Sequence, residues 1–114
     1  MIAYDEKGMT YGRKGDHDLA IAEFNKVLEI DPRNASAYNN RGYTYLMKGE
    51  IDRAFEDFNR SIEINTKFAL AYINRGNAYY VKRDQNKACF DWKKACENGS
   101  CAKYQQARGA KFCE

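Results

Sequence analysis

The side chains that could carry out catalysis are few and scattered. The chain of 114 residues has a single histidine, His17, in a turn that opens a predicted helix. An enzyme needs a nucleophile beside a base, or paired acids in a cleft, and the sequence indicates neither arrangement. No glycine-rich loop follows a strand pattern, so a phosphate site is not indicated. The sequence therefore predicts that the protein is not an enzyme and uses no cofactor.

The other reactive side chains are four cysteines in the last quarter of the chain, Cys89, Cys96, Cys101 and Cys113. Their spacings do not match the paired C-x-x-C units of zinc sites, so no metal site is predicted. The leading interpretation is buried thiols, because a free cysteine behaves as a small apolar residue. Disulfides Cys96–Cys101 or Cys89–Cys113 are an alternative, and metal or redox chemistry is a third. A Cys89–Cys96 disulfide is excluded, since seven residues along one helix rise about 10 Å.

An internal repeat of 34 residues organises the elements that would position these side chains. A ring–glycine–ring pattern and a second, alanine–ring pattern recur in three copies. The first pattern is Tyr4, Gly8 and Tyr11, then Tyr38, Gly42 and Tyr45, then Tyr72, Gly76 and Tyr79. The second is Ala20 and Phe24, then Ala54 and Phe58, then Ala88 and Trp92. Self-similarity at this period is the signature of a repeat architecture.

The spacing within each copy predicts two interlocking helices. The ring–glycine–ring pattern falls on one helical stripe, and the glycine lets a neighbouring helix come close. The small alanine opposite a large ring allows the second helix to interlock with the first. A glycine such as Gly15 or Gly49 ends the first helix of the pair, whereas Arg83 stands at the turn of the third copy.

At these residues the chain resembles the tetratricopeptide repeat (TPR) family, whose 34-residue helix–turn–helix unit carries the same aromatic, glycine and alanine positions. The resemblance covers residues 1 to about 101. The chain departs from the family at position 7, where the usual leucine is replaced by Lys7, Arg41 and Arg75. The resemblance implies an all-α fold, a right-handed α-solenoid that acts as a protein-binding scaffold.

We expect a single domain over residues 1–114, with repeats at 1–34, 35–68 and 69–101 and a capping helix at 102–114. Ala102, Gly109 and Phe112 keep the repeat spacing, so Phe112 is expected to pack against the preceding hairpin. The cap is the only chain left to cover the face that bears Trp92 and Phe90. Seven helices are predicted, at roughly 2–14, 17–30, 35–48, 51–64, 69–82, 85–97 and 101–113.

The resemblance also implies a binding groove lined by the first helix of each repeat. Asn40 and Asn74 hold the same position in adjacent repeats, and an amide can pair with both the N–H and the C=O of a peptide backbone. Alternatively, these amides solvate the groove or bond to a neighbouring helix. The predicted groove residues are Met9, Asn39, Asn40, Tyr43, Met47, Leu70, Asn74, Asn77 and Tyr80.

One well-known groove chemistry of the family does not fit. Members with a carboxylate clamp, which hold the acidic tails of heat-shock chaperones, use cations at positions that here hold Asp5, Leu70 and Asn74, and an asparagine where Met9 stands. Only Asn40 matches that pattern, and Asp5 would repel a carboxylate. The sequence therefore predicts a peptide groove that is not a carboxylate clamp.

The charge of the chain and its lack of long apolar segments argue against nucleic acid and membranes as binding partners. Residues 1–34 have a net charge of −2, residues 35–68 of zero and residues 69–114 of +5. A pI near 8.6 is too mild to indicate nucleic-acid binding, and no recognised motif supports it. No segment of this chain reads as a signal peptide or a transmembrane helix, which favours a cytoplasmic location without membrane insertion.

These observations lead to one functional hypothesis and one alternative. The hypothesis is a scaffold or adaptor that binds a protein or peptide, of unknown identity, in its concave groove. The alternative is a self-assembling module that forms homo-oligomers through its repeat ends, for which the basic C-terminal end supplies an attraction to an acidic end of another copy.

Overall fold

The structure, a computed structural model, describes residues 16–114, and the predicted helix over residues 2–14 lies outside this part. The described part is helical without strands, and six helices follow in chain order. They are α2 (His17–Ile30), α3 (Ala35–Lys48), α4 (Ile51–Ile64), α5 (Ala69–Val81), α6 (Gln85–Glu97) and α7 (Ala102–Gly109). The bounds of α2, α3, α4 and α6 agree with the predicted ones, and α5 ends one residue earlier.

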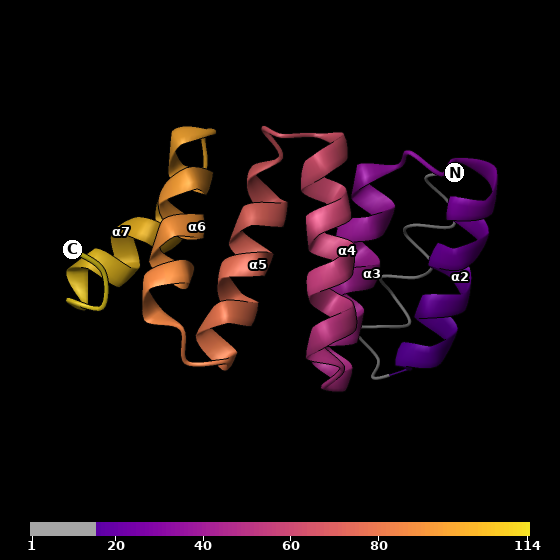
Figure 1. The fold of residues 1–114 in the computed structure, drawn as a ribbon, viewed down its shortest axis with the longest axis horizontal. Helices are drawn as coiled ribbons and strands as arrows, with labels where there is room; N and C mark the ends of the chain where they lie inside the picture. The colour runs from indigo at the N-terminus through magenta and orange to yellow at the C-terminus, as the bar shows by residue number, and fades with distance from the viewer. Residues whose placement is uncertain (1–15) are drawn as a thin grey trace.

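The helices succeed one another along the 41 Å long axis of the molecule, from α2 near one end to α7 at the other (Figure 1). Helices α3 and α4 form one packed hairpin and α5 and α6 another, while α3 also contacts α5 directly. This contact brings the first helices of adjacent repeats together on one side. No helix in residues 16–114 has the length and apolar character needed to cross a membrane.

Close helix contacts occur where the repeat places glycine opposite a ring. A Cβ built on Gly42 would lie 2.7 Å from Phe58 Cε1, and one built on Gly76 would lie 2.6 Å from two atoms of the Trp92 ring. Phe58 is fully buried and Trp92 is 2% exposed. The predicted close approach of a neighbouring helix at the glycine is therefore confirmed for Gly42 and Gly76, because any side chain at these glycines would displace the ring.

The arginines that depart from the family pattern form a repeated ion-pair ladder. Arg75 donates two hydrogen bonds to the Asp91 carboxylate, both of 2.8 Å, and a third to Asn59 of the preceding repeat. Arg41 repeats this arrangement on the Asp57 carboxylate, with bonds of 2.8 and 2.7 Å. Each guanidinium thus joins the two helices of its own repeat, and its third bond ties adjacent repeats together.

The pKa values of the ladder residues are shifted by partial burial and by their ion-pair partners. Burial raises the pKa of the Asp57 carboxyl above its ordinary value, although the Arg41 guanidinium acts in the opposite direction. The hydrogen bond to Asp57 in turn raises the pKa of Arg41, as Asp91 does for Arg75. These pairs are therefore part of the structural framework between helices.

Several described helices end in a tight turn with one residue in the left-handed conformation. Gly49 (φ 89°) and Gly99 (φ 103°) take this role after α3 and α6, as expected for glycine. Arg83 (φ 63°) and Lys111 (φ 62°) adopt the same conformation after α5 and α7, where a side chain makes it costly. The turns after α3 and α5 have the same backbone hydrogen bond. The Glu50 N–H donates to the Tyr45 carbonyl at 2.9 Å, and the Asp84 N–H donates to the Tyr79 carbonyl at 2.9 Å.

The last segment differs from the prediction in three ways. Helix α7 ends at Gly109 instead of residue 113, because the chain turns at Lys111 and the Phe112 N–H donates back to the Ala107 carbonyl at 2.8 Å. Phe112 reaches the preceding hairpin from this turn, not from the helix, and joins a cluster with Trp92 and Ala107. Phe90 stays 65% exposed, so the cap covers Trp92 and leaves Phe90 uncovered.

The expectation of buried free thiols is wrong for this structure. Cys89 is bonded to Cys113 and Cys96 to Cys101, and no cysteine is free. Both pairs are those that the sequence left open as alternatives. The physical reason is that the turn after α7 carries Cys113 back to α6, and the short turn after α6 brings Cys101 beside Cys96.

Candidate functional site

Two stripes of side chains on neighbouring first helices form the candidate site. On α3 the stripe runs through Asn39, Tyr43 and Met47, four residues apart, and on α5 it begins with Leu70 and Asn74. The hydrogen bond from Asn74 Nδ2 to Asn39 Oδ1, of 2.9 Å, places the two stripes side by side. We call this surface, made by the two stripes and by Tyr80 and Val81 at the end of α5, the α3–α5 face.

The large apolar side chains of the α3–α5 face are about half exposed to solvent. Tyr43 is 47% exposed, Met47 51%, Leu70 48% and Tyr80 56%. Val81, outside the predicted set, is 53% exposed beside Tyr80. Four of the nine predicted groove residues are therefore presented to solvent, and a row of exposed apolar groups on adjacent helices suits a peptide's side chains better than it suits water.

The amides of the predicted set are mostly turned inward. Asn39 is 1% exposed and Asn74 7%, and their mutual bond continues from Asn39 Nδ2 to Asn40 Oδ1 at 3.5 Å. Asn77 accepts a hydrogen bond of 3.1 Å from Trp92 Nε1. These three amides therefore join helices, and Asn40 is half-buried. Met9 lies outside the described residues.

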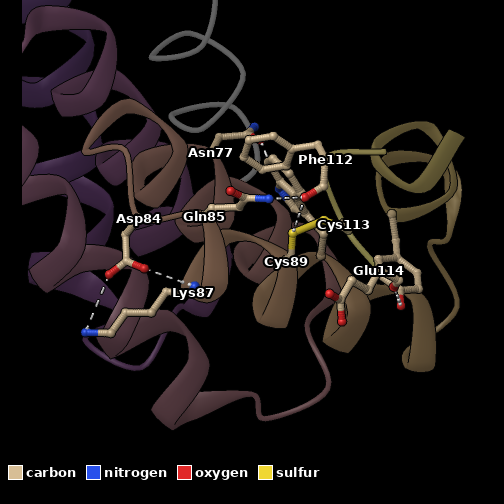
Figure 2. Close-up of a disulfide and its surroundings, with 10 residues drawn as sticks. Asn77, Asp84, Gln85, Lys87, Cys89, Phe112, Cys113 and Glu114 are labelled. Carbon is tan, nitrogen blue, oxygen red and sulfur yellow. Dashed lines mark hydrogen bonds and ion pairs between the residues drawn. A yellow bond between two sulfur atoms is a disulfide. The ribbon is translucent and has the colours of Figure 1, made fainter. Parts of the chain in front are cut away.

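A hollow at the C-terminal end of the α3–α5 face brings the predicted Tyr80 together with four residues that the sequence did not predict as a site. It is lined by Tyr80, Val81, Arg83, Gln85 and Phe112. Figure 2 shows the Gln85 side chain, which donates to the Phe112 carbonyl, next to the Cys89–Cys113 disulfide. Among the four lining residues that were not predicted, only Arg83 is unusual in the sequence, because it stands at a turn where earlier copies have glycine. The sequence did not indicate that Phe112 lines the hollow, since the place of Phe112 depends on the turn after α7.

The site has no constellation for metal binding or for a clamp of cations in the described part. No group of three or more histidine, cysteine, aspartate or glutamate side chains could hold a metal ion in residues 16–114. The clamp positions that fall in this part hold Asn40, Leu70 and Asn74, none of which is a cation. The described side chains of the face are therefore apolar groups, tyrosines and amides.

Solved structures similar to this chain are themselves TPR domains. The first TPR domain of Spaghetti (RPAP3), bound to the HSP90 peptide SRMEEVD, has a TM-score of 0.86 and 25% identity, covering 97% of this chain and 88% of that one. The first TPR domain of human RPAP3 has a TM-score of 0.82 and 26% identity, covering 96% and 93%. The Sgt2 TPR domain from Aspergillus fumigatus shares the fold at a TM-score of 0.85 and 23% identity, covering 96% and 75%.

Family models match the chain over its first two repeats. A model described as TPR repeat matches residues 8–49, and one described as tetratricopeptide repeat matches residues 35–68. No curated protein sequence matches the chain. Together the two models span residues 8–68, more than half of the chain, and they agree with the helical hairpins of the structure. The chain therefore belongs to the tetratricopeptide repeat family.

Proposed function

We propose that this protein is an interaction module that binds a peptide or partner segment on its α3–α5 face, mainly through apolar contacts. The observation that carries the proposal is the row of half-exposed Tyr43, Met47, Leu70 and Tyr80 on two adjacent helices. The TPR domains of Spaghetti (RPAP3), which share this fold, are bound to a peptide. Their likeness supports the class of function and leaves the ligand of this chain to experiment.

The chemistry of the face argues against an acidic tail held as in a carboxylate clamp. A terminal carboxylate needs fixed cations, and the described clamp positions hold amides and Leu70. In isothermal titration, we expect the peptide SRMEEVD to bind no better than a scrambled peptide of the same composition. Tight binding that depends on the order of its residues would contradict the apolar mode.

The proposal is tested by selecting random dodecapeptides displayed on phage against the oxidised protein. A Tyr43→Ser/Leu70→Ser variant removes two exposed apolar groups of the face without opening the core. The matched control is Ile30→Ser/Phe90→Ser, because Ile30 is 62% and Phe90 65% exposed outside the face. We expect the selected peptides to lose binding to the first variant and to keep it with the second. Equal binding to both variants would refute the proposal.

A further inference from the structure

The chain does not end with α7 but continues as a short C-terminal tail, residues 110–114, that folds back on the preceding hairpin. Within residues 16–114, Cys113 is bonded to Cys89 on α6, and the Gln85 amide donates to the Phe112 carbonyl (Figure 2). The Phe112 ring packs against the rings of Tyr80 and Trp92. The backbone bonds of Lys111, Phe112 and Cys113 go to Arg108 or Ala107 within α7 itself.

The tail forms one wall of the candidate site. The Phe112 ring lies 5.4 Å from the Tyr80 ring and 5.8 Å from the Trp92 ring, measured between centroids. Tyr80 belongs to the α3–α5 face, and Phe112 lines the hollow at the end of that face together with Val81. Any change in the position of the tail therefore changes the C-terminal end of the surface that we propose binds peptides.

The disulfide is the strongest of the attachments. Without it, the tail is held to α5 and α6 by the Gln85 hydrogen bond, by contacts of the half-buried Phe112 ring and by the packing of the Cys113 side chain. A neutral hydrogen bond contributes only about 1 kcal/mol to stability. The placement of the Phe112 ring therefore depends on the disulfide that Cys113 forms with Cys89.

We infer that the Cys89–Cys113 disulfide is a redox latch that completes the peptide-binding face when closed and dismantles its C-terminal end when reduced. This regulatory role rests on the proposed function of the face. The reductant is a dithiol, whose thiolate attacks the sulfur of Cys89, the less buried partner. The Cys89–Cys113 bond breaks, Cys113 leaves as a thiolate that takes up a proton, and a mixed disulfide forms between Cys89 and the reductant. The second thiolate of the reductant then displaces Cys89. Two electrons and two protons pass from the dithiol, which becomes a cyclic disulfide, and Cys89 and Cys113 become thiols.

The second disulfide does not have this role. Cys96–Cys101 spans five residues across the turn between α6 and α7. That turn has its own backbone bonds, since Gly99 N–H donates to Cys96 at 3.0 Å and Ser100 N–H to Ala95 at 2.9 Å. Opening this pair should therefore leave Phe112 in place, which makes it a matched control for the latch.

The latch is read out by Trp92, the only tryptophan of the chain, which is 2% exposed under the Phe112 ring. Dithiothreitol should shift Trp92 emission to longer wavelength, raise its quenching by acrylamide and speed tryptic cleavage after Lys111. Cys89→Ser/Cys113→Ser should show these properties without reductant, whereas Cys96→Ser/Cys101→Ser should still respond as the wild type does. Unchanged emission and cleavage in reduced wild type and in Cys89→Ser/Cys113→Ser would overturn the latch.

A fluorescein-labelled dodecapeptide from the phage selection tests the coupling to the face by anisotropy. Its affinity should fall on reduction and, with the disulfide intact, also in Phe112→Ala. Equal affinity in the oxidised and reduced proteins would overturn the regulatory role while leaving the binding function standing. If the selection yields no peptide, the proposed function fails and the regulatory role with it, and a Trp92 shift then reports movement of the tail alone.

Discussion

At the scale of single residues, two glycines set how closely the helices approach. Gly76 faces the Trp92 ring, and Gly42 faces Phe58 in the preceding repeat. The rings fill the space that a Cβ would need, so the contact area and the burial of the ring depend on the missing side chain.

We expect Gly76→Ala to lower the free energy of unfolding by about 1–3 kcal/mol, because the new Cβ would lie 2.6 Å from the Trp92 ring, which is buried on all sides. The measurement is urea denaturation followed by circular dichroism. The matched control is Gly109→Ala near the end of α7, where no atom lies within 4 Å of the new Cβ. Equal stability of Gly76→Ala and wild type would mean that the packing between α5 and α6 is different.

Arg75 explains why position 7 of the repeat departs from the apolar residue usual in the family. Its guanidinium pairs with the Asp91 carboxylate, which is 1% exposed. Removing either residue would leave the other charge buried without its partner. An apolar residue at position 7 would therefore require an uncharged residue at the aspartate position as well.

Arg75→Met should destabilise the protein by about 3 kcal/mol, since it leaves the Asp91 carboxylate buried and unpaired. The double variant Arg75→Met/Asp91→Leu should recover most of the loss, because both charges are then absent. A thermodynamic cycle of the single and double variants by chemical denaturation measures the coupling. Additive effects of the two changes would show that the pair is not coupled.

At the scale of elements, the turns that end the helices carry unequal conformational cost. Gly49 and Arg83 occupy equivalent turns after α3 and α5, and both have positive φ. The left-handed conformation costs an L-residue with a side chain about 1–2 kcal/mol, a cost that glycine avoids.

We expect Arg83→Gly to raise the free energy of unfolding by about 1 kcal/mol. The reason is that glycine removes the backbone strain at position 83 (φ 63°), a gain that is partly offset by the greater freedom of glycine in the unfolded chain. Thermal unfolding by calorimetry measures the change. The reverse substitution, Gly49→Ala, should lower the melting temperature. An unchanged or lower melting temperature for Arg83→Gly would indicate that its contacts outweigh the backbone cost.

Helix α7 and the tail act as the cover of the last hairpin. Ala107 and Cys113 are buried against Trp92 and Ala88, and Lys103 lies 5.0 Å above the Trp92 ring. Deleting residues 102–114 in a Cys89→Ser background should therefore expose an apolar surface, lower the melting temperature and promote association.

Light scattering coupled to gel filtration measures the association of the deletion variant. A variant of the undeleted chain, residues 1–114, with Lys103, Arg108 and Lys111 replaced by glutamine separates the effect of lost charge from that of lost cover, and it should remain monomeric. A deletion variant that stays monomeric with an unchanged melting temperature would show that α7 and the tail are not a cap.

At the scale of the whole molecule, self-association depends on the charge of the two ends of the repeat array and on the apolar surface that they expose. The basic residues 69–114 could attract the acidic residues 1–34 of another copy. However, the tail covers Trp92 of the last hairpin, and attraction between surface charges is screened by salt. We expect the oxidised protein to remain monomeric at high concentration, at low and at high salt, in light scattering. A salt-sensitive oligomer would instead favour the self-assembling module.

The two disulfides also bear on the compartment. Disulfides persist mainly in oxidising environments, whereas the sequence favoured the cytoplasm. The cytoplasmic location stays a prediction, and the four bonded cysteines weigh against it.

The repeat fold is determined locally, which is why the sequence by itself was sufficient to predict it. Each helical hairpin depends on the spacing of side chains within 34 residues, so Gly42, Phe58 and the bounds of α3 and α4 follow from the pattern. The exposure of Tyr43 and Leu70 also follows, because their positions on the helix are fixed by the same register.

Only the tertiary structure decided the features that join segments with no shared pattern. The direction in which Asn74 points depends on the packing of α3 against α5, and its amide bonds to Asn39 instead of facing solvent. The Cys89–Cys113 bond depends on a turn at Lys111 that ends α7 early, and Phe112 meets Tyr80 only because of that turn. Periodicity cannot predict such contacts, since they arise after the repeat pattern stops and join residues that share no position in the repeat.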